Sequence, residues 1–174
     1  MIIFDLDGTL ADCKHRRHFV DPKLNGVRWG AIEQSYSGNY VDERGLPSKW
    51  KPNWTAFFEA CDGDSPIEPV INVFDTLNCK RDDVEIWSGR CESVRDKTEK
   101  WLLEYSNSFE RDQLVMRPIG DYTPDDELKE SWLYELLENG DYVHYVFDDR
   151  PKVIRMWRRS GVFVYNCNQT GEEF

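Results

Sequence analysis

Hydrophobic residues along this chain form short unbroken runs, and sets of hydrophobic residues at helical spacing lie between them. The first run, Met-Ile-Ile-Phe at residues 1–4, is too short for a helix and fits a buried central strand of a parallel sheet. Apolar content and flanking turn residues predict further strands at 82–90, 111–117, 142–147 and 162–166. These runs would supply the strands of one sheet.

The segments between the predicted strands have the spacing of amphipathic helices. Pro124 and a group of acidic residues mark the start of one such segment, and Gly140 marks its end. A later segment should stop near Gly161. The predicted helices are 66–77, 94–102, 124–140 and 152–159.

Strands that alternate with helices indicate βαβ units, so we expect an α/β fold: a Rossmann-like three-layer sandwich with a mainly parallel sheet. Ligands of such sheets bind at the carboxyl ends of the strands. Polar residues follow several of the predicted strands and would meet at that edge, namely Asp5, Asp7, Ser88, Arg90, Asp148 and Asp149.

Residues 11–64 interrupt this alternation directly after the first strand. They are rich in Trp, Gly, Pro and charged residues, and only 54–61 has a helical pattern. A loop of this length is uncommon unless it is functional, so we expect a lid within a single domain. Its residues Trp29, Trp50 and Trp54 either pack internally or face a substrate base.

Composition limits the possible partners. The chain has 174 residues, of which 40% are hydrophobic, and its formal net charge is −11. That charge opposes non-specific attraction to a long polyanion, so any nucleic acid should be held locally, as a terminus or a single nucleotide. No apolar run approaches the roughly 20 residues of a membrane-spanning helix, and the N-terminus lacks the zones of a signal peptide. We therefore expect a cytoplasmic protein without a membrane partner.

The acidic residues at the strand ends imply a metal. Several carboxylates at one edge would repel one another unless a hard cation lies among them, and ligation by oxygen alone suits Mg²⁺. Mg²⁺ usually keeps waters and binds few protein carboxylates together with substrate phosphate oxygens. Ser88, Arg90 and Lys129 could bind or neutralise such a phosphate. The pattern therefore predicts phosphoryl chemistry.

Four ordered features resemble the motifs of the haloacid-dehalogenase (HAD) superfamily: DLDGT at 5–9, the strand-end Ser88, Lys129 in its helix, and the pair Asp148 and Asp149. Within that superfamily, WSGR (87–90), GDYTPDDELKE (120–130), FDDR (147–150) and MWRRSGV (156–162) resemble the 3′-phosphatase domain of bacteriophage-type polynucleotide kinase-phosphatase and related small stand-alone phosphatases. The GxxxxGK[ST] motif of an ATP-binding kinase half does not occur in the chain.

The resemblance implies a two-step phosphatase mechanism. Asp5 would attack phosphorus and form an aspartyl-phosphate, while Asp7 would protonate the leaving oxygen and later deprotonate water. Residues i and i+2 of an extended segment share a side, so both acids can face one phosphate. Gly8 would allow a sharp turn, and Thr9 would support the loop by hydrogen bonding.

The resemblance also assigns roles to the remaining candidates. The metal would be held by Asp5, Asp148 and Asp149, together with the backbone carbonyl of Asp7. Asp125 lies four residues before Lys129 and would hold that lysine in place. The phosphate or nucleotide would be bound by Thr9, Arg16, Ser88, Gly89, Arg90 and Asp125.

The sequence leaves the substrate and two rival functions open. The phosphate could belong to a nucleoside monophosphate or to a nucleic-acid 3′ end; the net charge of −11 and the long insertion favour the smaller substrate. A catalytically silent protein that binds a phosphorylated ligand is one rival, although it would have no chemical need for Asp7. A phosphotransferase that passes the phosphoryl group to an alcohol is the other.

Overall fold

The computed structural model describes residues 1–21, 24, 51–80, 83–169 and 171. It divides the chain into two compact units: Met1–Asp12 with Ser65–Phe174, and Cys13–Asp64. Trp29 and Trp50 of the predicted insertion lie outside the described residues. The lid role of the segment 11–64 stays a prediction.

The first unit is built on a parallel five-stranded sheet in the order β5-β4-β1-β6-β7. Its central strand β1 pairs with β4 on one side and β6 on the other. The strands are β1 (Ile2–Phe4), β4 (Val84–Cys91), β5 (Leu114–Arg117), β6 (Tyr145–Asp148) and β7 (Phe163–Asn166). A separate antiparallel pair joins β2 (Ala11–Asp12) to β3 (Ser65–Pro66).

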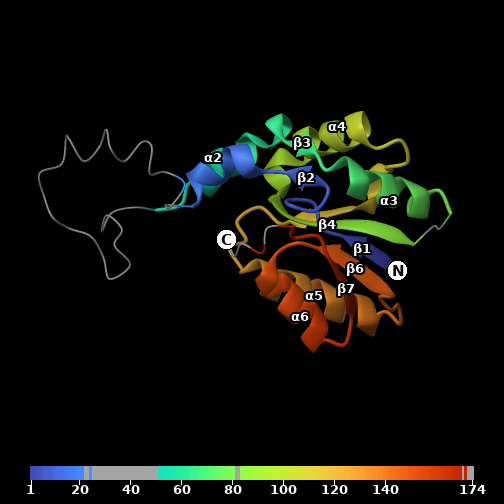
Figure 1. Cartoon of the computed structure of the whole chain (residues 1–174). Helices are drawn as coiled ribbons and strands as arrows, with labels where there is room; N and C mark the ends of the chain where they lie inside the picture. The colour runs from blue at the N-terminus through green and yellow to red at the C-terminus, as the bar shows by residue number, and fades with distance from the viewer. Residues whose placement is uncertain (22–23, 25–50, 81–82, 170, 172–174) are drawn as a thin grey trace, which may run out of the picture. The chain divides into compact units, whose positions relative to one another are not determined.

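Helices cover both faces of the sheet, which confirms the predicted three-layer α/β fold. Figure 1 shows α3 and α4 on one face of the first unit and α5 and α6 on the other. Short 3₁₀ helices at Glu92–Val94 and Arg111–Gln113 join these layers. The main helices are α3 (Glu68–Asn78), α4 (Arg95–Tyr105), α5 (Asp125–Glu138) and α6 (Pro151–Arg159).

Alternation along the central strand divides the core between the two faces. Ile3 belongs to the cluster that packs against α5 and α6, where Leu133 and Trp157 are almost fully buried. The next residue, Phe4, points to the other face, where its ring meets Phe74 of α3. Because both faces are apolar, the strand reads as an unbroken hydrophobic run, as buried parallel strands do. Asp5 is therefore the first residue after the buried strand.

Two strands begin three residues later than predicted. Residues 111–113 of the segment 111–117 form a 3₁₀ turn, which is stabilised by a reciprocal capping box between Glu110 and Gln113. Strand β6 begins at Tyr145, three residues after the predicted start, and it includes Asp148. Local side-chain capping accounts for the first difference.

The second unit contains a 3₁₀ helix at Lys14–Phe19, helix α2 (Trp54–Glu59) and a 3₁₀ turn at Cys61–Gly63. The Asn53 side chain caps α2 by accepting a hydrogen bond from the Ala56 amide at 3.0 Å. Trp54, the remaining tryptophan of the predicted insertion, lies on α2 and contacts the rings of Phe57 and Phe58. Across the described parts of the chain, every helix is too short or too polar to cross a membrane.

Candidate active site

Three buried carboxylates meet at the carboxyl edge of the sheet. Asp5 directly follows β1, and Asp148 and Asp149 lie at the end of the neighbouring strand β6. One oxygen from each residue lies within 4.8 Å of the others, and the three residues are 7%, 0% and 3% exposed. The edge predicted from the strand pattern is therefore where the acids gather.

Lys129 of α5 supplies a positive charge to this cluster. Its Nζ donates to Asp5 Oδ1 at 2.6 Å and to Asp148 Oδ2 at 2.9 Å. The lysine is only 3% exposed. One ammonium group thus links the residue after β1 to the last residue of the neighbouring strand β6. Charge-assisted hydrogen bonds of this kind hold side chains in a defined direction.

The charges of the cluster shift the pKa values of its members. Burial raises the pKa of Asp5 well above its usual value, Asp148 and Asp149 raise it further, and Lys129 opposes them. Burial by itself lowers the pKa of Lys129, but the charges of Asp148 and Asp5 outweigh burial and raise it. Carboxylates this close repel one another, and a bound cation would relieve that repulsion.

Asp148 and Asp149 have different surroundings. Asp148 Oδ1 accepts from the Arg150 amide at 3.0 Å, and its Oδ2 accepts from Lys129 and from Trp157 Nε1 at 3.3 Å. Both oxygens of Asp148 are therefore bound to donors of the protein. Asp149 instead faces the loop after β1, where the Thr9 hydroxyl donates to its Oδ1 at 3.5 Å.

The loop after β1 is a tight turn that requires glycine. Gly8 has a φ of +94°, a region that favours glycine. A Cβ at this position would collide with the carboxylate of Asp149. The amides of Leu10 and Ala11 both donate to the Leu6 carbonyl at 2.9 Å, which closes the turn. Gly8 therefore provides space for an acid as well as the turn.

We expect Gly8→Ala to lower phosphate release about 10²-fold, because the new methyl group displaces Asp149. Gly140→Ala is the matched control, since Gly140 also has a positive φ, of +87°, but nothing within 4 Å of its added Cβ. The control should show only backbone strain, about 1–2 kcal/mol in the free energy of unfolding. Equal losses of stability with retained activity in both variants would contradict a role for the Gly8 contact.

Asp7 is held by an arginine and not by the lysine. Arg90 donates to Asp7 Oδ1 from Nε at 2.9 Å and from Nη2 at 2.5 Å. The arginine is fully buried and its Nη1 lies 3.4 Å from the Thr98 hydroxyl. The register of β4 shifts between Ser88 and Cys91, and bulges of this kind redirect side chains near active sites. The predicted phosphate-binding Arg90 thus also orients Asp7.

Ser88 at the same strand end is also buried, and its Oγ accepts from the Arg90 amide at 3.2 Å. Gly89 beside it leaves space for another acid, because a Cβ there would lie 2.6 Å from Asp125 Oδ1. At this strand end, Gly89 thus lies beside Asp125 and Arg90 beside Asp7, while Ser88 contacts the Arg90 backbone.

Asp125, which the resemblance predicts to hold Lys129 in place, makes no hydrogen bond to that lysine. Its two carboxylate oxygens instead accept from Arg117 and from Arg150, while the hydrogen bonds of Lys129 go to Asp5 and Asp148. The Asp125 charge still helps to raise the pKa of Lys129. Sequence reasoning missed both arginines, although each lies at or directly after a strand end, where such residues are expected.

Arg16, the other predicted phosphate-binding arginine, lies in the second unit. Its Nε and Nη2 each donate to one oxygen of Asp64 at 2.7 Å, and its Nη1 donates to the Phe57 carbonyl at 3.1 Å. The Arg16 and Asp64 side chains are both fully buried. These contacts hold the unit together, and a role of Arg16 in phosphate binding stays a prediction.

Cys167, which the sequence did not single out, follows β7 at the same edge. Its amide donates to the Asp148 carbonyl at 2.9 Å. Burial raises the pKa of the Cys167 thiol to about 12, and the charges of Asp149, Asp148 and Asp5 act in the same direction. The thiol is therefore protonated at neutral pH, which excludes it as a thiolate nucleophile.

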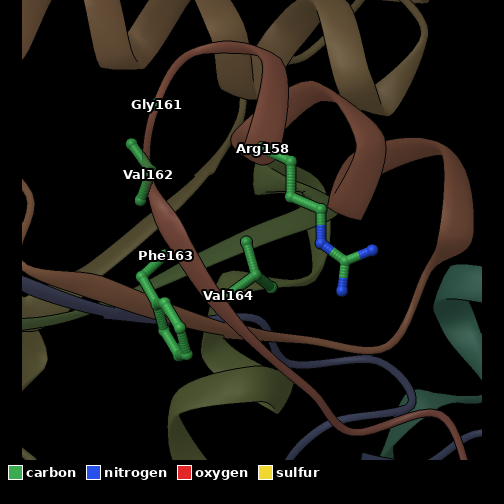
Figure 2. Close-up of a pocket in the computed structure, with 5 residues that line it drawn as sticks. All are labelled: Arg158, Gly161, Val162, Phe163 and Val164. Atoms are coloured by element: carbon green, nitrogen blue, oxygen red, sulfur yellow. The ribbon is translucent and has the colours of Figure 1, made fainter.

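A surface hollow of about 360 Å³ lies elsewhere, between the end of α6 and the start of β7 (Figure 2). Phe163, one of its lining residues, pairs with Tyr145 at the amino end of β6, whereas Asp148 at the carboxyl end pairs with Asn166. The hollow thus lies at the edge of the sheet opposite the acids. Its other lining residues are Arg158, Gly161, Val162 and Val164.

Comparison with known proteins agrees with this geometry. The family model of the polynucleotide kinase PNKP phosphatase domain matches residues 55–172. Two similar solved structures are described as the Pnkp1/Rnl/Hen1 complex, at 24% identity and a TM-score of 0.63, and as the Pnkp1/Rnl/Hen1 RNA repair complex, at 26% and 0.60. Each match covers 95% of this chain but only 44% and 41% of the respective relative, so the chain spans less than half of each.

A third similar structure is that of CbbY from Rhodobacter sphaeroides in complex with phosphate. It is 16% identical, with a TM-score of 0.51, and the match covers 98% of this chain and 88% of the other. At this identity the likeness shows the fold alone. No protein of curated function matches the chain.

Proposed function

Because this chain belongs to the family of the polynucleotide kinase PNKP phosphatase domain, within the HAD superfamily of phosphatases, we propose that it is a Mg²⁺-dependent phosphomonoesterase. Its substrate is a nucleotide phosphate, and the reaction proceeds through an aspartyl-phosphate on Asp5. The observation that carries the proposal is the buried bridge from Lys129 to Asp5 and Asp148, with Asp149 beside it.

Asp5 is the nucleophile in the proposed reaction. One of its oxygens forms a bond to phosphorus as the bond from phosphorus to the leaving oxygen breaks. Lys129, 2.6 Å from Asp5 Oδ1, keeps the carboxylate oriented and neutralises part of the charge that gathers on the phosphoryl oxygens. Both residues are buried, which strengthens the electrostatic interaction between them.

Asp7 is the proton shuttle. It gives a proton to the leaving oxygen in the first step; in the second it takes a proton from the water that attacks phosphorus and releases Asp5. Arg90 holds Asp7 through two bonds to one oxygen, and the Asp7 side chain is 21% exposed. Asp7 is thus fixed in direction yet open to a substrate and to water.

The acid cluster fits a bound Mg²⁺. Three carboxylate oxygens from separate residues lie within 4.8 Å of one another, and oxygen-only donor sets are what this ion prefers. Asp5, Asp148 and Asp149 are the candidate carboxylate ligands, with the Asp7 carbonyl as a further one. When bound, Mg²⁺ would polarise the phosphoryl group and neutralise its charge.

We infer a nucleotide as the substrate from the family, whose description is a polynucleotide kinase phosphatase. Relatives of similar fold occur in a complex described as one for RNA repair. This favours the 3′-phosphate end of a nucleic acid, whereas the net charge of −11 favours a mononucleotide. Both substrates would present a phosphate monoester of a nucleotide to Asp5, so measurement must separate them.

Comparison of substrates tests the proposal directly. We expect phosphate release in Mg²⁺ from a 3′-phosphorylated oligonucleotide and from 3′- or 5′-nucleoside monophosphates, compared at equal concentration. Chelation by EDTA should abolish release, and added Mg²⁺ should restore it, because the acids at Asp5 and Asp149 need a cation to share the site with a phosphate. If neither the nucleotides nor an aryl phosphate release inorganic phosphate, the result would support a catalytically silent binding protein instead.

A phosphotransferase is distinguished by its product. If the aspartyl-phosphate on Asp5 passes its phosphoryl group to an alcohol, added acceptor alcohols should divert product away from inorganic phosphate in proportion to their concentration. Hydrolysis predicts constant phosphate release with and without glycerol.

A further inference from the structure

Two large apolar side chains stand out from the loop that joins β5 to α5, residues 118–124. Tyr122 is 89% exposed and Ile119 is 74% exposed, the two highest values among the large hydrophobic residues that the structure describes. Exposed apolar area is unfavourable by about 25 cal/mol for each Å² that a partner could cover. An exposed aromatic ring on a loop next to the strand ends could gain from covering by a ligand.

The loop backbone is held in place although these side chains are free of the core. The Asp121 amide donates to the Pro118 carbonyl at 3.2 Å, and the Thr123 amide donates to Asp121 Oδ1 at 2.8 Å. Arg117 donates to the Thr123 carbonyl at 2.5 Å. The direction in which Tyr122 leaves the loop is thus set before any ligand binds, which lowers the entropy lost on binding.

The loop adjoins the acid cluster through one arginine. The Arg117 guanidinium donates both to the Thr123 carbonyl and, from Nε at 2.9 Å, to the Gly89 carbonyl. Gly89 lies between Ser88 and Arg90, the strand end that holds Asp7. The Arg117 side chain therefore connects Thr123, the residue after Tyr122, to the strand end that is predicted to bind the phosphate.

We propose that Tyr122, flanked by Ile119, stacks on the base of the nucleotide whose phosphate lies at Asp5. This rests on the proposed function and extends it to the base. An aromatic ring accepts any base, because every base has a flat face, and stacking contributes about 1–3 kcal/mol per base. The net charge of −11 gives a polyanion little general attraction, so affinity must come from local contacts of this kind.

The test compares Tyr122→Ala and Tyr122→Phe on two substrates: a short 3′-phosphorylated oligonucleotide and the same strand without its terminal base. Tyr122→Ala should raise KM for the first about 5- to 100-fold and for the abasic strand less than about twofold. Tyr122→Phe should stay near the wild type on both, since the flat ring remains. Tyr134→Ala is the matched control, because Tyr134 is 57% exposed on α5 and should change neither KM.

The failure of this inference is distinguishable from failure of the proposed function. If the wild type cleaves the base-bearing substrate and Tyr122→Ala leaves its KM unchanged, the base contact is overturned and the phosphatase assignment stands. If KM rises equally on both strands, Tyr122 supports the site without touching a base, which also overturns the inference. If the wild type releases no phosphate from any nucleotide, both fail together.

Discussion

Replacement of Asp5 by asparagine should abolish phosphate release, with a loss of about 10³-fold or more in kcat. The amide has nearly the shape of the carboxylate but cannot form the bond to phosphorus that the mechanism requires. Burial raises the pKa of Asp5, so the cation and Lys129 must keep it ionised for attack. Phosphate release from an aryl phosphate at saturating Mg²⁺ measures the effect.

Two controls separate chemistry from folding for this variant. Asp141→Asn alters an exposed acid beyond α5 and should keep wild-type turnover. Thermal unfolding of Asp5→Asn should remain cooperative, because the change removes a buried charge without changing volume. Normal turnover by Asp5→Asn would overturn the nucleophile assignment. Acid quenching with labelled substrate should trap phosphate on the wild type and none on the variant.

Lys129→Met should be the most damaging substitution for stability at the site. Removing the ammonium group leaves the Asp5 and Asp148 carboxylates buried without their shared partner. Loss of one partner from a buried ion pair costs about 3–5 kcal/mol in the free energy of unfolding. Phosphate release should fall as well, because Lys129 neutralises charge at the nucleophile. Urea unfolding without Mg²⁺ measures the stability loss.

The pH dependence of stability and a control variant at an exposed lysine test the role of Lys129 further. The acids raise the pKa of Lys129 above its ordinary value of 10.5. The contribution of Lys129 to the free energy of unfolding is therefore complete below pH 10.5 and is lost only as the pH rises through the raised pKa. Lys152→Met is the control, because Lys152 pairs with Asp126 at 2.8 Å but is 55% exposed. That surface pair should contribute less than about 1 kcal/mol. Equal effects of the two substitutions would contradict the buried bridge.

Much of the first unit could be predicted because its signals are local. The run Ile2–Phe4 is apolar on both faces, and the helix Asp125–Glu138 has acids in its first turn. Residues 111–113 were predicted as strand but form a 3₁₀ turn, and this difference also has a local cause. The Glu110 and Gln113 side chains accept hydrogen bonds from backbone amides and stabilise the turn before the strand begins. The hydrophobic pattern contains no information about such capping.

The sequence predicted which residues gather at the candidate site better than it predicted which hydrogen bonds they form. Parallel strands end at one edge, so Asp5 and Asp148 were expected together before any coordinates. The resemblance predicts that Asp125 holds Lys129 in place, and the structure shows hydrogen bonds from Arg117 and Arg150 to Asp125. Spacing places two residues on one helix face, but competition from cations on other elements decides which bond forms.

The sequence by itself determined the order of the elements, the parallel sheet and the edge where the acids lie, because hydrophobic periodicity and strand ends are properties of neighbouring residues. Only the tertiary structure decided how charges pair: Lys129 with Asp5 across 124 positions, and Arg90 with Asp7 across 83. It also showed that the oxygens of Asp148 are occupied while Asp149 faces the Gly8 turn. Long-range pairs depend on the directions of side chains from separate elements, and linear spacing does not specify those directions.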